Sequence, residues 1–184
     1  GVKLKNLLVS KFIQPSHKKF IKTANLIWSP DSDKIAIVHS SQGIAGLAVF
    51  SLKTDTVKFV YKVQTGGVEE GFSLQAKWFA DSSRILVSGP GGTKIVDINT
   101  KSTQELAKDA WLAYVTGEGK KIIYISGSLY NNSKLLFEVW QYDLEKKSSE
   151  KLLSVETYPA APTVSRDGRY LVFQKLQTTD PQFF

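Results

Sequence analysis

The sequence lacks cysteine altogether, and it contains only two histidines among its 184 residues. Without cysteine the chain has neither a disulfide nor a thiolate nucleophile. His17 and His39 lie apart in the sequence, and neither is accompanied by the further donors at defined spacing that a metal site requires. We therefore exclude thiol chemistry, and we expect no metal ion and no other cofactor.

Long apolar runs and catalytic loop motifs are also missing. No segment approaches the roughly 18 consecutive apolar residues that cross a bilayer as a helix. No Gly-x-Ser-x-Gly nucleophile elbow is present. The glycine-rich segments 66–67 and 89–92 lack the following Lys-Ser/Thr of a phosphate-binding loop, so we interpret them as turns. We predict that the chain is not an enzyme.

What the sequence does contain is one pattern that occurs four times. The clearest copy runs from Trp28 to Ile37 and reads Trp-Ser-Pro-Asp-Ser-Asp-Lys-Ile-Ala-Ile. Each copy has an apolar residue, an acidic residue three positions later, and then two apolar residues two positions apart. This arrangement is typical of a strand, a tight turn and a second strand. The further copies begin at Trp78, Val115 and Val164.

The acidic residue of each copy is predicted to shape the turn. A carboxylate at this place accepts hydrogen bonds from backbone N–H groups about two residues further on, and Ser or Gly beside it tolerates the unusual dihedral angles. The residue recurs with the turn and does not converge with other polar groups, so we interpret it as structural and not catalytic. The predicted turn residues are Asp31, Asp81, Glu118 and Asp167.

Two more strands are predicted after each of the first three copies. Segments 48–54, 94–100 and 139–145 each read as a third strand that leads into a polar turn, and 57–60, 103–106 and 150–153 fit a fourth, outer strand. Four short strands at a period of about 40 residues are typical of a β-propeller blade. The predicted fold is therefore all-β, a propeller or partial propeller of about four four-stranded antiparallel blades. The predicted blades span 21–63, 72–107, 110–153 and an incomplete 157–184.

The incomplete fourth blade leaves two interpretations of the chain. In the first, residues 1–20 supply the missing outer strands of the fourth blade, which makes 1–184 a single closed domain without open sheet edges. In the second, the chain is a fragment of a larger propeller. We favour the second interpretation because four blades are at the lower limit of this architecture.

The first hairpin and the strand that follows it carry a resemblance to a known family. Trp28-Ser29-Pro30-Asp31 opening a hairpin, together with a later strand that ends in an Asp-apolar turn, resembles the propeller repeat of the TolB type. The resemblance covers about residues 24 to 173. It implies an extracytoplasmic place, in the periplasm or at the cell surface of a bacterium. The same repeat is typical of the propeller domains of prolyl-oligopeptidase-like enzymes.

The aromatic residues divide into packing residues and a candidate partner surface. Trp28 and Trp78 hold the same repeat position, so we expect both to pack between blades. Loops 64–73 and 127–136 are expected to carry recognition, because loops vary while strands are held by packing. The candidate partner surface consists of Trp111, Tyr130, Phe137 and Trp140.

The net charge of +7 is compatible with an acidic partner, an anionic lipid or nucleic acid. The lysines fall in predicted turns and outer strands and seldom alternate with exposed aromatic residues, which is more typical of a solvated surface that discourages aggregation. We therefore do not expect nucleic acid as the partner.

These observations predict a non-enzymatic scaffold that binds a protein partner through its loops in the bacterial cell envelope. The alternative is the propeller domain of a larger peptidase that gates substrate access, in which case a peptide is the ligand. A catalytic domain with a nucleophile elbow elsewhere in the gene product distinguishes the second function from the first.

Overall fold

The computed structural model describes residues 24–41, 43–64, 74–89, 91–116, 119–131, 134–156, 159–165 and 167–175. Within these residues the chain forms strands β1 to β14 and no helix. The strands make three four-stranded sheets and one two-stranded sheet, each antiparallel and built from strands consecutive in sequence. The all-β, blade-like prediction is confirmed. Residues 1–20, proposed to complete the fourth blade, lie outside the described residues.

The strands of each sheet are consecutive in the sequence. The first sheet contains β1 (Ala24–Trp28), β2 (Lys34–Ser41), β3 (Ile44–Ser51) and β4 (Thr56–Gln64). The second contains β5 (Gln75–Trp78), β6 (Arg84–Ser88), β7 (Thr93–Asp97) and β8 (Thr103–Ala107). The third contains β9 (Ala110–Val115), β10 (Lys121–Asn131), β11 (Lys134–Asp143) and β12 (Ser148–Val155). The fourth contains β13 (Pro159–Val164) and β14 (Leu171–Lys175).

The sequence repeat occupies the same structural position in every sheet. Its first apolar residue closes the first hairpin by pairing with the apolar residue seven positions later. The four closing pairs are Trp28↔Ile35, Trp78↔Ile85, Val115↔Ile122 and Val164↔Leu171. The four copies therefore build equivalent corners of successive sheets.

The third strands correct one detail of the predicted alignment. Ile35, Ile85 and Ile122 pair across to the third strands at Phe50, Val96 and Tyr142. Segment 140–146, and not 139–145, is therefore the equivalent of 94–100. A register shift on the outer strand pair confirms this, because it occurs immediately before residues 48, 94 and 140. Adjacent apolar residues on β11 make the alternation compatible with both registers, and only the pairing distinguishes them.

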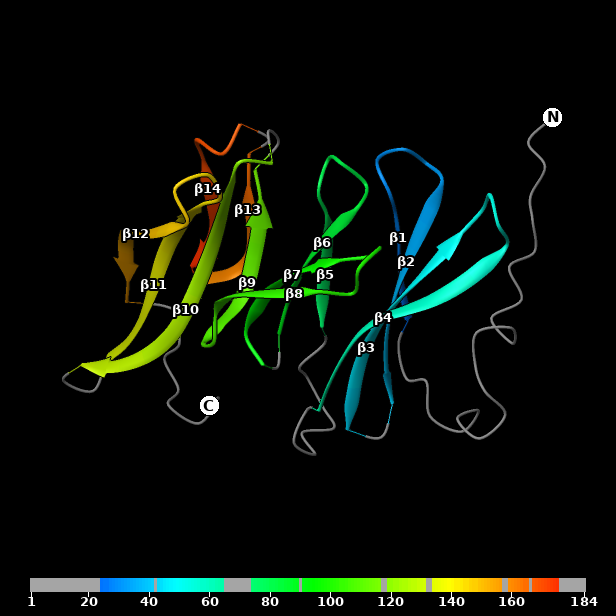
Figure 1. Ribbon diagram of the computed structural model, residues 1–184. Coiled ribbons are helices and arrows are strands. Elements are labelled where there is room, and N and C mark those ends of the chain that lie inside the picture. The colour runs from blue at the N-terminus through cyan, green and yellow to red at the C-terminus, as the bar shows by residue number, and fades with distance from the viewer. Residues whose placement is uncertain are drawn as a thin grey trace.

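The core of the molecule consists of three seams between successive sheets. Leu47 of the first sheet packs with Ile85 and Val87 of the second, and Leu86 on the opposite face of β6 packs with the third sheet. A third cluster joins the third sheet to Leu171 of the fourth. Because side chains alternate across a strand, an inner sheet is apolar on both faces. The four sheets form an open row with the first and fourth at its ends (Figure 1).

Candidate functional site

Three of the predicted turn residues accept backbone hydrogen bonds inside their turns. Asp31 Oδ1 accepts the N–H of Asp33 at 3.1 Å, Asp81 Oδ1 accepts that of Ser83 at 2.9 Å, and Asp167 Oδ1 accepts that of Arg169 at 3.1 Å. Glu118 lies outside the described residues. In all four copies the following residue has positive φ; these residues are Ser32 (58°), Ser82 (54°), Gly119 (68°) and Gly168 (73°). The left-handed residue explains why Ser or Gly follows the acid.

Each of these carboxylates also binds a basic side chain. Lys34 Nζ lies 2.7 Å from Asp31 Oδ2, and Arg84 Nε lies 2.6 Å from Asp81 Oδ2. The hydrogen bond from Lys34, then that from the Ser29 hydroxyl, holds the pKa of Asp31 far below its ordinary value. A general acid that works near neutral pH needs a raised pKa. The carboxylate of Asp31 therefore acts as an ionised acceptor that stabilises the turn.

The same chemistry operates at the opposite end of the sheet row. Asp167 pairs with Arg169 Nε at 2.6 Å, and its pKa is lowered first by the hydrogen bond from the Ser165 hydroxyl and then by the Arg169 N–H. At Asp81, burial by itself raises the pKa, but hydrogen bonds from Ser83 and Arg84 outweigh it and the net pKa is lowered. The turns are thus alike in electrostatics as well as in backbone shape.

A second recurring turn links the third and fourth strands, and no role was predicted for its acidic residues. Asp97 Oδ1 accepts the N–H groups of Asn99 (2.9 Å) and Thr100 (2.8 Å), and Asp143 Oδ1 accepts those of Glu145 and Lys146, both at 2.9 Å. The turn begins at Ser51 in the first sheet, at Asp97 in the second and at Asp143 in the third. The residue four positions later again has positive φ; these residues are Asp55 (55°), Lys101 (62°) and Lys147 (53°). The readable signal was Asp followed by an apolar residue at the end of the third strand in the second and third sheets; the first sheet has Ser51 at this place.

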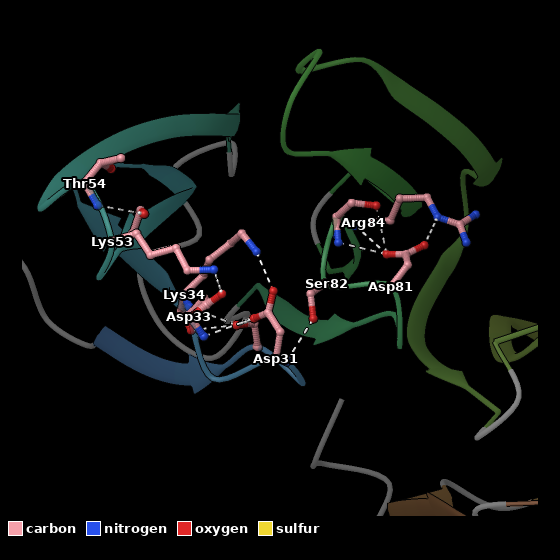
Figure 2. A network of polar contacts seen from close by, with 11 residues as sticks. Asp31, Asp33, Lys34, Lys53, Thr54, Asp81, Ser82 and Arg84 are labelled. Atoms are coloured by element: carbon pink, nitrogen blue, oxygen red, sulfur yellow. Dashed lines mark hydrogen bonds and ion pairs between the residues drawn. The ribbon is translucent and has the colours of Figure 1, made fainter.

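The turns of the first two sheets are joined directly. The backbone N–H of Asp31 donates to Ser82 Oγ at 3.0 Å, and Ser82 is buried. Figure 2 shows this contact beside the Asp31–Lys34 and Asp81–Arg84 pairs. Lys53 also forms an ion pair with Asp33, which connects the two turns of the first sheet. The polar network therefore orients one sheet against the next.

Further polar contacts cross the seams at points where backbone carbonyls are exposed to the neighbouring sheet. Trp78 Nε1 donates to the carbonyl of Ile27 at 3.0 Å. Lys58 Nζ donates to the carbonyls of Ile98 (2.9 Å) and Asn99 (2.7 Å). These bonds fix the orientation of sheets whose apolar packing alone is not directional. The described sheets are therefore joined by both apolar packing and directional hydrogen bonds.

The structure does not bring the candidate partner surface together. Phe137 is 3% exposed and lies in the seam toward the fourth sheet. Trp140 packs on the opposite face of β11, stacked on Tyr124 with ring centroids 6.4 Å apart. Two residues three positions apart on a strand point to opposite faces, so Phe137 is a core residue and the prediction that it faces a partner is wrong. Nothing is described of the Trp111 and Tyr130 side chains.

The segment predicted as loop 127–136 is mostly a β-hairpin. β10 and β11 pair as far as Asn131↔Lys134, with a register shift between Ser126 and Leu129. Figure 1 shows this hairpin extending beyond its neighbours in the third sheet. Most of the other predicted recognition loop, 64–73, lies outside the described residues. We call the paired segments 127–131 and 134–136 the β10–β11 tip, and the predicted recognition role falls on this segment.

Three large apolar side chains on one face of the first sheet are more than half exposed. Trp28 is 57% exposed, and Leu26 and Phe59 on the same face, which points away from the second sheet, are 60% and 55% exposed. Ile35, Ala48 and Phe50 on this face are buried. The prediction that Trp28 packs between blades is not confirmed in the described residues, whereas Trp78, at the equivalent position, packs in the first seam. We call the surface of Leu26, Trp28 and Phe59 the first end face.

The described residues contain neither a metal-binding cluster nor a membrane-spanning helix. Within them, no three His, Cys, Asp or Glu side chains are grouped so as to hold a metal ion. The same residues contain no helix with the length and apolar character needed to cross a membrane. The polar side chains described above are arranged around backbone groups of turns and seams.

No family model and no curated protein matches this sequence. Solved structures do match its fold. TolB from Acinetobacter baumannii aligns with a TM-score of 0.59 at 19% identity, over 85% of this chain and 39% of TolB. Oligogalacturonate lyase from Vibrio parahaemolyticus aligns with a TM-score of 0.57 at 12% identity, over 78% of this chain and 43% of the lyase.

A protease propeller shows the same likeness. The β-propeller domain of the Trilobed protease from Pyrococcus furiosus aligns with a TM-score of 0.52 at 17% identity, over 71% of this chain and 43% of that one. The chain thus spans about two fifths of the length of each of these structures. At such identities the likeness establishes the fold, which is a TolB-like β-propeller arrangement of blades.

Proposed function

We propose that this chain is a non-enzymatic β-propeller scaffold, or part of one, that binds a protein partner in the bacterial cell envelope. The proposal is carried by one observation: the perturbed carboxylates of the described residues serve as ionised acceptors for turns. Side chains committed in this way stabilise a platform and do not form a reaction site. The likeness to TolB over most of the chain supports the envelope location.

The β10–β11 tip is the proposed recognition element. It projects from the third sheet (Figure 1), and its strands are the longest described, with 11 and 10 residues. An extended hairpin on a rigid scaffold positions side chains for a partner at little additional ordering cost. The stacked pair of Tyr124 and Trp140 lies at the base of the same hairpin and holds it against the second sheet.

Affinity capture from a bacterial envelope extract tests this function, with the full chain as bait. In the test variant, residues 128–136 are replaced by a two-residue Asn-Gly turn, which closes the hairpin early between Gly127 and Phe137 and keeps the Ser126↔Glu138 register. In the matched control, Lys53-Thr54-Asp55 is replaced by the equivalent Asn99-Thr100-Lys101 sequence. We expect the test variant to lose the captured protein and the control to retain it, with both unfolding like the parent chain. Equal capture by both variants, or peptide hydrolysis by the chain alone, contradicts the proposal.

A second candidate function is substrate gating in a peptidase whose catalytic domain is separate from these sheets. The likeness to the propeller domain of the Trilobed protease favours it. In that case the chain binds short unstructured peptides and shows no preference for a folded envelope protein. Titration with a mixed hexapeptide library, monitored by tryptophan fluorescence, distinguishes the two: saturable peptide binding that survives replacement of 128–136 favours gating.

A further inference from the structure

The three four-stranded sheets share one irregularity in their strand pairing. In each of them the outer strand pair shifts its register, immediately before residue 48 in the first sheet, residue 94 in the second and residue 140 in the third. The shift occurs at the equivalent position every time. It therefore belongs to the common architecture of the repeat and not to any one sheet.

The third sheet has two further register shifts, and both involve β10. This strand shifts against β9 between Ile125 and Ser126, and against β11 between Ser126 and Leu129. In the first and second sheets the corresponding inner pairs keep a single register over their described residues. The two additional shifts lie together at the base of the β10–β11 tip, which is the hairpin that projects from the third sheet (Figure 1).

The shift against β11 comes from one extra residue in β10. Gly127 and Ser128 of β10 together lie opposite the single residue Phe137 of β11. Gly127 has φ of 42°, and a glycine with left-handed φ at the first position is the pattern of a G1 bulge. An extra residue of this kind bends the strand and increases its local twist. The hairpin is therefore bent at the point where its tip begins.

The bulge is held from its other side by the residue that precedes β9. The Gly127 N–H donates to the Asp109 carbonyl at 3.3 Å. Ser126, the last residue before the bulge, is buried. A Cβ atom at Gly127 would lie 3.6 Å from Asp109 Oδ2, an ordinary contact distance, so the left-handed φ and not a lack of space favours glycine here. The bend thus has a fixed place on a packed part of the sheet.

We propose that the bulge at Gly127 positions the recognition hairpin: it sets the direction in which the β10–β11 tip projects, and so it determines which partner surface the tip reaches. Gly127 is in this sense a positioning residue that need not touch the partner. The inference rests on the proposed function of the tip. It is carried by the coincidence of two register shifts specific to the third sheet with the hairpin that projects. A hairpin that already has the bound direction loses less freedom on binding than one that must first be bent.

Deletion of Ser128 in the full chain tests the proposal. It removes the extra residue and leaves every other pair of the hairpin in place, with Gly127 alone opposite Phe137. Deletion of Leu152 is the matched control, because Leu152 is the extra residue of β12 at the shift that recurs in all three sheets. We expect both deletion variants to fold and to unfold in urea with midpoints close to that of the parent chain.

The direction of the tip is measured without any partner. The chain contains no cysteine, so spin labels on Lys134→Cys in the tip and Thr103→Cys on β8 give one distance by pulsed electron paramagnetic resonance. We expect the Ser128 deletion to change the mean distance by about 3 Å or more, roughly the rise of one strand residue. We expect the Leu152 deletion to leave it unchanged.

Binding is then titrated with one purified probe, the envelope protein that the parent chain captures and the 128–136 replacement loses. We expect the Ser128 deletion and Gly127→Val to weaken binding by about tenfold or more, because the tip then points away from its partner. Gly127→Asn tolerates left-handed φ, so this variant and the Leu152 deletion are expected to stay within about twofold of the parent chain.

The outcomes separate this inference from the proposed function. If no captured protein depends on residues 128–136, the proposed function itself fails. If capture depends on them, an unchanged distance after the Ser128 deletion overturns the inference, and so does a changed distance with unchanged binding. Equal weakening by the Leu152 deletion overturns it as well. If the Ser128 deletion fails to fold, Gly127→Val replaces it with Gly127→Asn as control, and equal distances or equal binding in these two variants overturn the inference.

Discussion

Trp28 and Trp78 occupy the same position of the same repeat and have different environments. Trp78 packs in the first seam and donates its indole N–H across it, whereas Trp28 stands on the first end face with 57% of its surface exposed. Their local structure is the same, since each closes its hairpin opposite an isoleucine. The difference shows that burial in this fold is a property of neighbouring sheets and not of the repeat itself.

The largest expected effect is a difference in the free energy of unfolding between alanine substitutions of these two tryptophans. Trp78→Ala removes a seam side chain and an indole hydrogen bond, so we expect a loss of about 3 kcal/mol in the free energy of unfolding. Trp28→Ala is expected to cost less than about 1 kcal/mol, because this side chain is more than half exposed. Urea unfolding followed by circular dichroism measures both. Equal losses at the two positions contradict the comparison of seam and end face.

A smaller effect is expected for the polar bonds that orient the seams. Lys58→Met keeps most of the aliphatic stem but removes the donor to the Ile98 and Asn99 carbonyls, so we expect a loss of about 1 kcal/mol. Lys62→Met, an exposed position on the same strand, serves as the matched control. The same unfolding measurement applies, and a control that loses as much as Lys58→Met disproves the role given to Lys58.

Acid is expected to weaken the turns of both the first and the second sheet. The pKa of Asp31 in the first sheet and that of Asp81 in the second are both lowered by hydrogen bonds in the folded chain. The unfolded chain therefore takes up more protons as the pH falls, and the stabilisation is present above the ordinary Asp pKa of about 3.9 and is lost as the pH falls through the folded pKa values.

Thermal unfolding between about pH 6 and pH 3 measures this loss. We expect the melting temperature to decrease toward low pH. We expect a shallower decrease for Asp31→Asn and Asp81→Asn, because asparagine keeps a side-chain oxygen that accepts the backbone N–H but carries no charge that titrates. A melting temperature that rises on acidification, or variants with the slope of the parent chain, contradicts the electrostatic account of the turns.

The smallest expected effect concerns the left-handed turn residues. Lys147 has φ of 53°, a conformation that costs a non-glycine residue about 1 kcal/mol or more. Lys147→Gly relieves this cost but adds freedom to the unfolded chain, so we expect a net gain of about 0.5 kcal/mol. Lys147→Val, with a β-branched side chain, is expected to destabilise instead. We therefore expect the midpoint of urea unfolding to be highest for Lys147→Gly, intermediate for the parent chain and lowest for Lys147→Val.

Much of the fold was predictable because its signals are local. The acidic residue and the left-handed residue after it determine the first turn, and the closing pair follows from the spacing of apolar residues. The alignment of the third strand failed by one residue in the third sheet, where Val139, Trp140 and Tyr142 are all apolar. Apolar alternation is ambiguous there, and Asp143 at the turn is the better marker.

The candidate partner surface was much less predictable than the fold. Phe137 and Trp140 are neighbours in sequence but face different seams, and the segment 127–136 read as a loop because its polar composition hides a paired hairpin. The exposure of Leu26, Trp28 and Phe59 was missed for the opposite reason, since these residues have the composition of packed residues. Composition alone does not distinguish an apolar surface that is covered from one that is open.

The sequence by itself determined the hairpins, their turns and the alternation of apolar residues, because these depend on hydrogen bonds and dihedral angles within about ten residues. Only the tertiary structure decided which apolar face is buried, which indole reaches a carbonyl on another sheet and which faces stay open. The physical reason is that burial of a sheet face depends on a second sheet, and the position of that sheet is set by side chains some 50 residues away in the chain.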